Sequence, residues 1–160
     1  MSNGNFIENV LLRFDQVQDQ LLFKDNTDKE MLFSEPIVEF TIDGDIFRGG
    51  YVPIDGAKPS VFYEVLEDGK TQLLKRTSKK IFEETPYSSA TKVKTISSTE
   101  TYYLLPNGGT QLVKVKKDKK SLLDAMGNKK SELDQFIKDQ RLNLRNDSDM
   151  AKLVAYYNSL

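Results

Sequence analysis

Apolar and polar residues alternate along the first two thirds of the chain, a pattern that predicts β-strands. Within residues 6–25, apolar side chains recur at every second position, at Leu12 and Phe14 and again at Leu21 and Phe23. Polar residues separate the two runs. We therefore expect two short strands joined by a polar turn.

The same alternation continues through residues 31–52. Phe40 and Ile42 point to one side of the expected strand, with Glu39 and Thr41 on the other. The Asp-Gly pair at positions 43 and 44 is typical of a two-residue hairpin turn, because both residues tolerate a positive φ angle. A second hairpin is predicted here.

A short sequence then occurs twice. "VLEDGKTQLLK" at 65–75 returns 39 positions later as "LLPNGGTQLVK" at 104–114. Pro106 has no N–H to close a two-residue turn, which favours a three-residue loop with Gly108 in the left-handed position. The repeat is interpreted as one hairpin used twice in an antiparallel sheet, with no chemistry implied.

The shared loop type also predicts a register. The first copy would set Tyr63 opposite Leu73, and the second would set Tyr102 opposite Leu112. Leu73 and Leu112 are therefore expected to be buried at equivalent positions on one sheet face.

From Ser121 the spacing of apolar residues changes to that of a helix. One segment starts at Ser121, which stands in capping-box spacing with Asp124, and ends at Gly127. A second helix is expected over 129–140, and a last one over 148–158. The stripe on the last helix is formed by Met150, Leu153, Val154 and Tyr157.

Together these patterns predict an α+β fold in a single domain, 1–160. Residues 1–118 are expected to be mainly β, as a meandering antiparallel sheet of about seven or eight strands that is curled or barrel-like. Residues 119–160 are expected to be helical, with two or three C-terminal helices. A length of 160 residues suits one core.

The composition of the chain limits the possible functions, mainly through the residue types that are absent. Lys and Arg total 23 against 24 for Asp and Glu, so no strong net charge attracts nucleic acid or anionic lipid. The chain has no His and no Cys, which removes the imidazole bases, the thiolates and the usual zinc ligands. Any catalysis would have to rest on carboxylates, Lys or Tyr. We expect no catalytic, cofactor-binding or metal-ligating residue and no cofactor.

Two features of the chain bear on where it acts. The start "MSNGNFIENV" resembles no signal sequence, and no segment approaches the ~20 apolar residues of a membrane helix. The expectation is a soluble chain without a membrane span.

A lysine run offers one candidate site for anionic partners. The run is interpreted as a solvent-exposed strand end, because no aromatic residues are interleaved with the lysines and acidic residues surround them. Nucleic-acid binding is not expected. The lysines are Lys114, Lys116, Lys117, Lys119 and Lys120, followed by Lys129 and Lys130.

Carboxylates and aromatic residues offer two more candidates. Asp43, Asp45 and Asp55 lack the spacing of a calcium loop and are interpreted as turn residues. The aromatic residues could line a carbohydrate platform, but alternating strand positions favour ordinary sheet packing. These aromatic residues are Tyr51, Phe62, Tyr63, Tyr87, Tyr102 and Tyr103.

Nearly the whole chain resembles an uncharacterised protein family of Bacteroidota. The resemblance is carried by "ENVLLRFDQVQDQLLFKD", by "VFYEVLEDGKTQLLKR" and most specifically by the C-terminal "LVAYYNSL". It implies a location in the cell envelope, in the periplasm or outside the cell. It implies no activity and no catalytic residue.

Two hypotheses for function follow. The first is a non-catalytic envelope or secreted module that binds a protein or glycan partner. The alternative is a carbohydrate-active or small-ligand-binding protein that uses carboxylates and tyrosines. A deep pocket with paired carboxylates would favour the alternative, and a packed sheet interior would favour the first.

Overall fold

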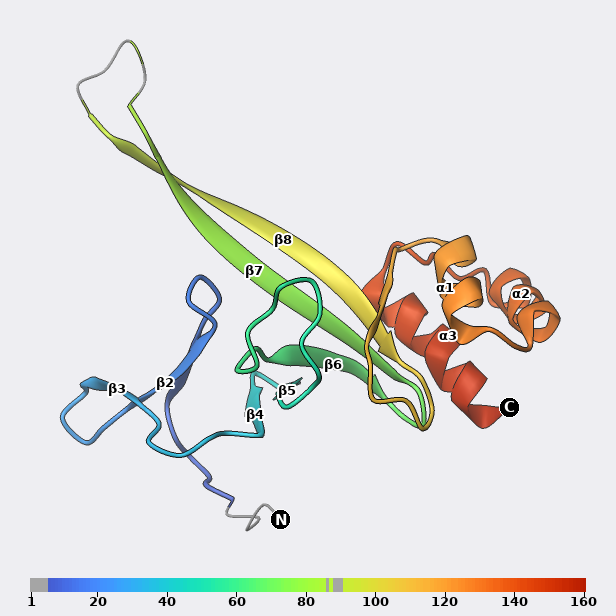
Figure 1. Cartoon of the computed structure of the whole chain (residues 1–160), viewed down its shortest axis with the longest axis horizontal. Helices are drawn as coiled ribbons and strands as arrows, with labels where there is room; N and C mark the ends of the chain where they lie inside the picture. The colour runs from blue at the N-terminus through green and yellow to red at the C-terminus, as the bar shows by residue number, and fades with distance from the viewer. Residues whose placement is uncertain (1–5, 86, 88–90) are drawn as a thin grey trace.

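The computed structural model describes residues 6–85, 87 and 91–160. Over these residues the chain forms two antiparallel sheets followed by three helices (Figure 1). The smaller sheet has the order β1-β2-β3, with β1 at Leu12–Asp15, β2 at Gln20–Lys24 and β3 at Glu30–Leu32. The larger has the order β4-β5-β6-β7-β8-β9 and contains β4 (Glu39–Ile42), β5 (Asp45–Arg48), β6 (Tyr63–Asp68), β7 (Gln72–Glu84), β8 (Val93–Leu105) and β9 (Val113–Val115).

The predicted α+β class, with an antiparallel meander and C-terminal helices, is confirmed. The expectation of one curled or barrel-like sheet is not met, because the strands divide into two sheets and the larger one is not closed. The Asp43-Gly44 turn is confirmed: Ile42 pairs with Asp45, and both turn residues have positive φ angles of 54° and 92°.

The helices cover one face of the larger sheet and form the main core. They are α1 (Lys119–Met126), α2 (Lys130–Asp139) and α3 (Asp147–Ser159). Leu73 and Leu104 from the sheet pack against Leu133 of α2 and Leu153 of α3, all at most 1% exposed. Of the apolar stripe expected on the last helix, Met150, Leu153 and Val154 are fully buried in this core and Tyr157 is partly buried against it.

The opposite face of the sheet has its own smaller core. Leu74, Tyr63 and Tyr103 lie there beneath the segment that carries Tyr51 and Ile54. The smaller sheet is joined to β4, β5 and the segment before β6 by an aromatic cluster, in which the ring of Phe14 lies 5.3–6.0 Å from the rings of Phe40, Phe47 and Phe62.

The repeated segments do not have the predicted register. In the first copy the turn comes later than predicted, with Asp68 paired to Gln72, so Glu67 rather than Tyr63 lies opposite Leu73, and a bulge between Val65 and Glu67 then shifts the pairing by one residue. In the second copy Tyr102 pairs with Val115. Gly108 does adopt the predicted left-handed conformation, with φ of 71°.

The two leucines that were expected to be equivalent lie on opposite faces, because Leu73 pairs with Leu104, and Leu104 pairs on its other side with Val113, the neighbour of Leu112. Both are buried, but Leu73 belongs to the core under the helices, whereas Leu112 belongs to the core on the opposite face. The prediction of burial is confirmed and the prediction of a shared face is wrong.

The helix boundaries differ from the expected ones at their starts. Asp118, not Ser121, caps α1, because its side chain accepts a hydrogen bond from the Ser121 N–H at 2.7 Å. Gly127 ends α1 with a φ of 74°, as expected. Among the described residues, no helix combines the length and apolar character needed to cross a membrane.

Candidate functional site

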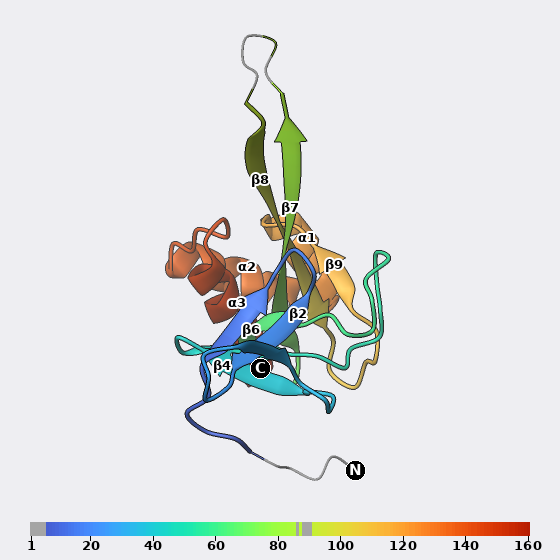
Figure 2. The ribbon, with the colours of Figure 1, turned by 90° about the vertical axis from the view of Figure 1, so that its left-hand side faces the viewer.

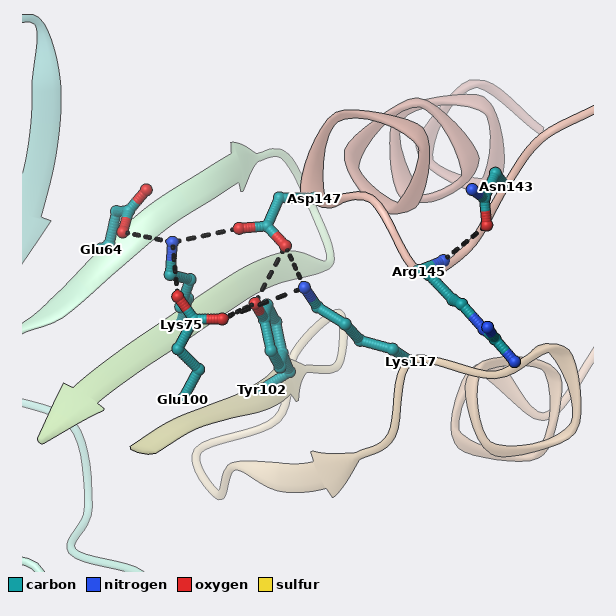
Figure 3. A network of polar contacts seen from close by, with 8 residues as sticks. All are labelled: Glu64, Lys75, Glu100, Tyr102, Lys117, Asn143, Arg145 and Asp147. Carbon is teal, nitrogen blue, oxygen red and sulfur yellow. Dashed lines mark hydrogen bonds and ion pairs between the residues drawn. The ribbon is translucent and has the colours of Figure 1, made fainter. Parts of the chain in front are cut away.

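A compact cluster of charged residues joins the start of α3 to the larger sheet (Figure 3). Asp147, the first residue of α3, accepts hydrogen bonds from Lys75 on β7 at 3.0 Å and from Tyr102 on β8 at 2.9 Å. Lys117 lies 2.7 Å from the same carboxylate and 4.5 Å from the centre of the Tyr102 ring. The negative side chain also stands at the positive end of the helix dipole.

Two further carboxylates surround Lys75. Glu64 on β6 lies 3.1 Å from the Lys75 ammonium, and Glu100 on β8 lies 3.8 Å from it. The hydroxyl of Tyr102 lies 2.9 Å from Glu100 and 2.9 Å from Asp147, and its single proton is shared between the two carboxylates. The side chains of Lys75 and Asp147 are 14% and 29% exposed, so the cluster is partly shielded from water.

The pKa values of Lys75, Asp147 and Tyr102 are all shifted away from neutral pH. Burial lowers the pKa of Lys75, but hydrogen bonds to Asp147 and Glu64 outweigh it and the pKa is raised. Burial raises the pKa of Asp147, but hydrogen bonds from Lys117, Lys75 and Tyr102 leave it lowered. Burial and the two carboxylates raise the pKa of Tyr102.

These directions define the chemistry of the cluster. A general acid or base works best when its pKa lies near the working pH, and here each shifted pKa moves away from 7. The cluster joins the sheet to α3 through charged side chains, and none of Lys75, Asp147 and Tyr102 is poised to exchange a proton at neutral pH.

Several lysines of the run form separate ion pairs with acidic residues. Lys114 lies 2.7 Å from Asp55, Lys119 lies 2.6 Å from Asp134, and Lys130 lies 2.6 Å from Asp124. Lys116 is exposed, as the interpretation as a solvated strand end requires. Lys117 departs from that interpretation, because it takes part in the Asp147 cluster with only 30% of its side chain exposed.

The carboxylates considered for calcium do not come together. Asp55 is held by Lys114 and by the hydroxyl of Tyr103, while Asp43 and Asp45 lie at the β4–β5 turn. Over residues 6–85, 87 and 91–160, no group of three or more acidic side chains is placed to hold a metal ion.

The aromatic residues do not form one platform. Tyr63 stands edge-on to both Tyr51 and Tyr103, with ring centres 5.5 and 5.6 Å apart, inside the smaller core. Tyr102 is buried on the opposite face, and Tyr87 is fully exposed. A shallow hollow of about 360 Å³ beside Tyr102 contains a single carboxylate, that of Glu100.

The larger sheet carries a feature that sequence reasoning missed, a two-stranded arm. β7 and β8 are each 13 residues long and pair along their whole length, from Gln72–Leu105 to Glu84–Val93. β6 pairs with β7 only as far as Lys75, and β9 pairs with β8 only as far as Tyr102. The rest of the ribbon projects beyond both sheets and the helices (Figures 1 and 2).

This arm exposes apolar side chains on both of its faces. Ile81 lies directly opposite Ile96 on one face, and the two are 51% and 63% exposed. Phe82 and Val93 lie on the other face and are 49% and 48% exposed. Every described residue from Lys80 to Glu100 is exposed, so the arm has no core of its own.

Comparisons of the chain with protein-family models, with curated proteins and with solved structures gave no match. The resemblance to a Bacteroidota family therefore stays a prediction, and the function must be argued from the arm and the clusters described above.

Proposed function

We propose that the protein is a non-catalytic interaction module that binds another polypeptide along the β7–β8 arm. The observation that carries this proposal is the exposure of Ile81, Phe82, Val93 and Ile96 on a ribbon that leaves the body. An isolated two-stranded ribbon is marginally stable in water, and a third strand or a covering surface stabilises it.

The backbone of the arm supports the same proposal. Beyond Lys79 on β7, and before Tyr102 on β8, no strand within the described residues pairs with the outer edges of the ribbon. Such edges bind extended segments through main-chain hydrogen bonds, with side-chain contacts adding specificity. A protein partner uses both the edges and the apolar faces of the arm.

The alternative of a carbohydrate or small-ligand site has less support. It needs tyrosines and carboxylates gathered at one pocket, but Tyr63 and Tyr103 are buried in one core and Tyr102 in the other. The resemblance to the Bacteroidota family adds the proposal that the partner is met in the cell envelope or outside the cell.

Photo-crosslinking tests the proposed function. A photoreactive amino acid placed at Phe82 is expected to form one or a few discrete adducts in the native cells, identified by mass spectrometry. The control is the same group at Lys120, which is exposed on α1 outside the arm. Equal adducts from both positions, or none from Phe82, would contradict the proposal, and adducts to a glycan would favour the alternative.

A further inference from the structure

The outer edge of β7 has no paired neighbour beyond Lys79 within the described residues. The N–H of Lys79 donates to the carbonyl of Gln16 in the turn after β1, at 3.0 Å. Alternate residues of a strand direct their N–H and C=O groups to the same side, so Ile81 and Glu83 direct theirs to this edge as well. β8 occupies the opposite edge. The edge is therefore available from Lys80 to Glu84, with the polar groups of Ile81 and Glu83 facing outward.

The residues along this edge read Lys79-Lys80-Ile81-Phe82-Glu83-Glu84. The two lysines come first, the two apolar residues lie in the middle and the two glutamates come last. When two copies of such a segment run antiparallel, the lysines of each copy approach the glutamates of the other. The segment is thus complementary in charge to itself.

We propose that the partner of this edge is a second copy of the chain, paired antiparallel about a two-fold axis at Phe82. This inference rests on the proposed function and names its partner. Phe82 then faces Phe82 of the other copy, and Lys80 faces Glu84. Ile81 faces Glu83, and the outward N–H and C=O groups of these two residues form the hydrogen bonds between copies.

The hydrogen bonds select this register over the neighbouring one. An axis at Ile81 would also set a lysine against a glutamate, Lys79 against Glu83. That arrangement requires the Lys79 N–H to bond to the second copy, although it already donates to Gln16. An axis at Phe82 uses only edge groups from Ile81 onward.

The proposed pairing also brings the Phe82 side chains of the two copies together on one face of the sheet. Two ribbons joined through β7 give a four-stranded sheet in the order β8-β7-β7-β8. Phe82 already lies opposite Thr95 on β8, so the central row of one face becomes Thr95, Phe82, Phe82 and Thr95. Four strands are enough for independent stability, whereas two are not.

The outer edge of β8 is less suited to the same role. Its self-complementary charges would be Lys94 and Glu100. Glu100 already accepts a hydrogen bond from Tyr102 at 2.9 Å and lies 3.8 Å from Lys75. Within the described residues Lys80 and Glu84 make no ion pair, so both side chains can pair with those of a second copy.

Charge reversal tests the pairing in the purified chain. Dimerisation is measured by analytical ultracentrifugation over a wide range of concentration. Lys80→Glu alone and Glu84→Lys alone each place like charges together twice per dimer, and each is expected to raise the dimer dissociation constant by roughly 10-fold or more. The double variant K80E/E84K, and an equimolar mixture of the two single variants, are both expected to dimerise as the unmodified chain does.

The matched control is Lys116→Glu, which makes the same charge change at an exposed lysine outside the arm. It is expected to leave dimerisation unchanged. Melting temperatures of all the variants should agree with that of the unmodified chain, because neither Lys80 nor Glu84 contributes to the core.

A disulfide gives a second readout that does not depend on charge. The chain has no cysteine, so Phe82→Cys introduces a single thiol. Directly opposed residues of two strands lie within the Cα separation that a disulfide spans, and mild oxidation is expected to give a covalent dimer. Ile81→Cys is the control, because the two copies of position 81 would lie about 8 Å apart.

Three results would overturn the inference. They are a chain that stays monomeric at every concentration, a dimer that survives both single charge reversals, and a dimer lost on Lys94→Glu but not on Lys80→Glu. If the chain is monomeric while the photoreactive group at Phe82 still captures another protein, the self-pairing fails and the proposed function stands. If that group captures nothing, the proposed function itself fails.

Discussion

Asn158 near the end of α3 makes two hydrogen bonds to the backbone of Thr71, 87 residues earlier. Its side-chain oxygen accepts from the Thr71 N–H at 2.8 Å, and its side-chain nitrogen donates to the Thr71 carbonyl at 2.9 Å. Thr71 is only 3% exposed, so these bonds satisfy backbone groups that water does not reach. The last turn of α3 is thereby fixed to the turn between β6 and β7.

This contact predicts a coupling between Asn158 and Gly69. A Cβ atom on Gly69 would lie 2.1 Å from the side-chain nitrogen of Asn158. Gly69→Ala is expected to destabilise the fold by displacing Asn158, and Asn158→Ala by about 1–3 kcal/mol through the unsatisfied backbone groups of Thr71. In a double-mutant cycle measured by urea unfolding, Gly69→Ala should cost much less once Asn158 is Ala. Additive effects would contradict this reading.

The Asp147 cluster predicts a loss of stability that depends on pH. Asp147→Asn is expected to lower the free energy of unfolding at pH 7 by about 1–3 kcal/mol, since Lys75 and Lys117 lose a charged partner. The pKa of Asp147 is lowered in the folded protein, so its contribution is complete above the unfolded value near 3.9 and is lost as the pH falls through the folded value. The free energies of unfolding of the two proteins in urea should begin to converge as the pH falls below about 4. A constant difference down to pH 2 would count against the ion pairs as the cause.

The two neighbouring lysines of the run should respond differently to loss of charge. Lys117→Gln removes contacts to Asp147 and to the ring of Tyr102 and is expected to cost roughly 0.5–1.5 kcal/mol, discounted for partial exposure. Lys116→Gln, at an exposed position, should stay within about 0.5 kcal/mol of the unmodified chain. Equal effects in thermal unfolding would mean that the cluster adds little to stability.

Removal of α3 should prevent folding, whereas removal of the arm should not. Met150, Leu153 and Val154 are fully buried, and their burial contributes on the order of 5–9 kcal/mol, comparable with the net stability of a domain. Deletion of residues 147–160 is expected to abolish cooperative thermal unfolding. In the matched control, an Asn-Gly turn replaces residues 81–96 between the hydrogen-bonded pair Lys80 and Ser97, and melting should stay near that of the full chain. A cooperative transition in the first variant would sink this prediction.

Local patterns in the sequence predicted the strands and helices, but they did not predict how the strands pair. The Asp43-Gly44 turn and the end of α1 at Gly127 follow from φ preferences, which are properties of single residues. The facing of the two copies depended on contacts outside the repeat. The copies pair alike, since Glu64–Lys75 corresponds to Tyr103–Lys114, but the pairing of β7 with β8 sets them on opposite faces of the sheet, with Leu112 beside Tyr103 and Val61.

The arm escaped prediction for a similar reason. Alternation at Ile81, Phe82 and Ile96 looks the same whether a strand lies in a sheet or projects from it, because exposure depends on how far the neighbouring strands reach. β6 stops pairing with β7 at Lys75, and the sequence of β7 itself does not mark that point. The charge order of residues 79–84 was the one local signal available, and a search for self-complementary segments would have found it. The Asp147 cluster gathers residues from four elements and has no sequence signature.

The continuity of β7 and β8 has a mechanical consequence. The same two strands form the arm and, from Gln72 to Lys75 and from Tyr102 to Leu105, the centre of the larger sheet. A pull on the arm along its length therefore acts parallel to β6 and β9, which flank the pair. The flanking hydrogen bonds would be sheared together and would not open one at a time. A partner that holds the arm is thus anchored to the two central strands of the larger sheet, and tension passes from them to β6 and β9 through the hydrogen bonds between the strands.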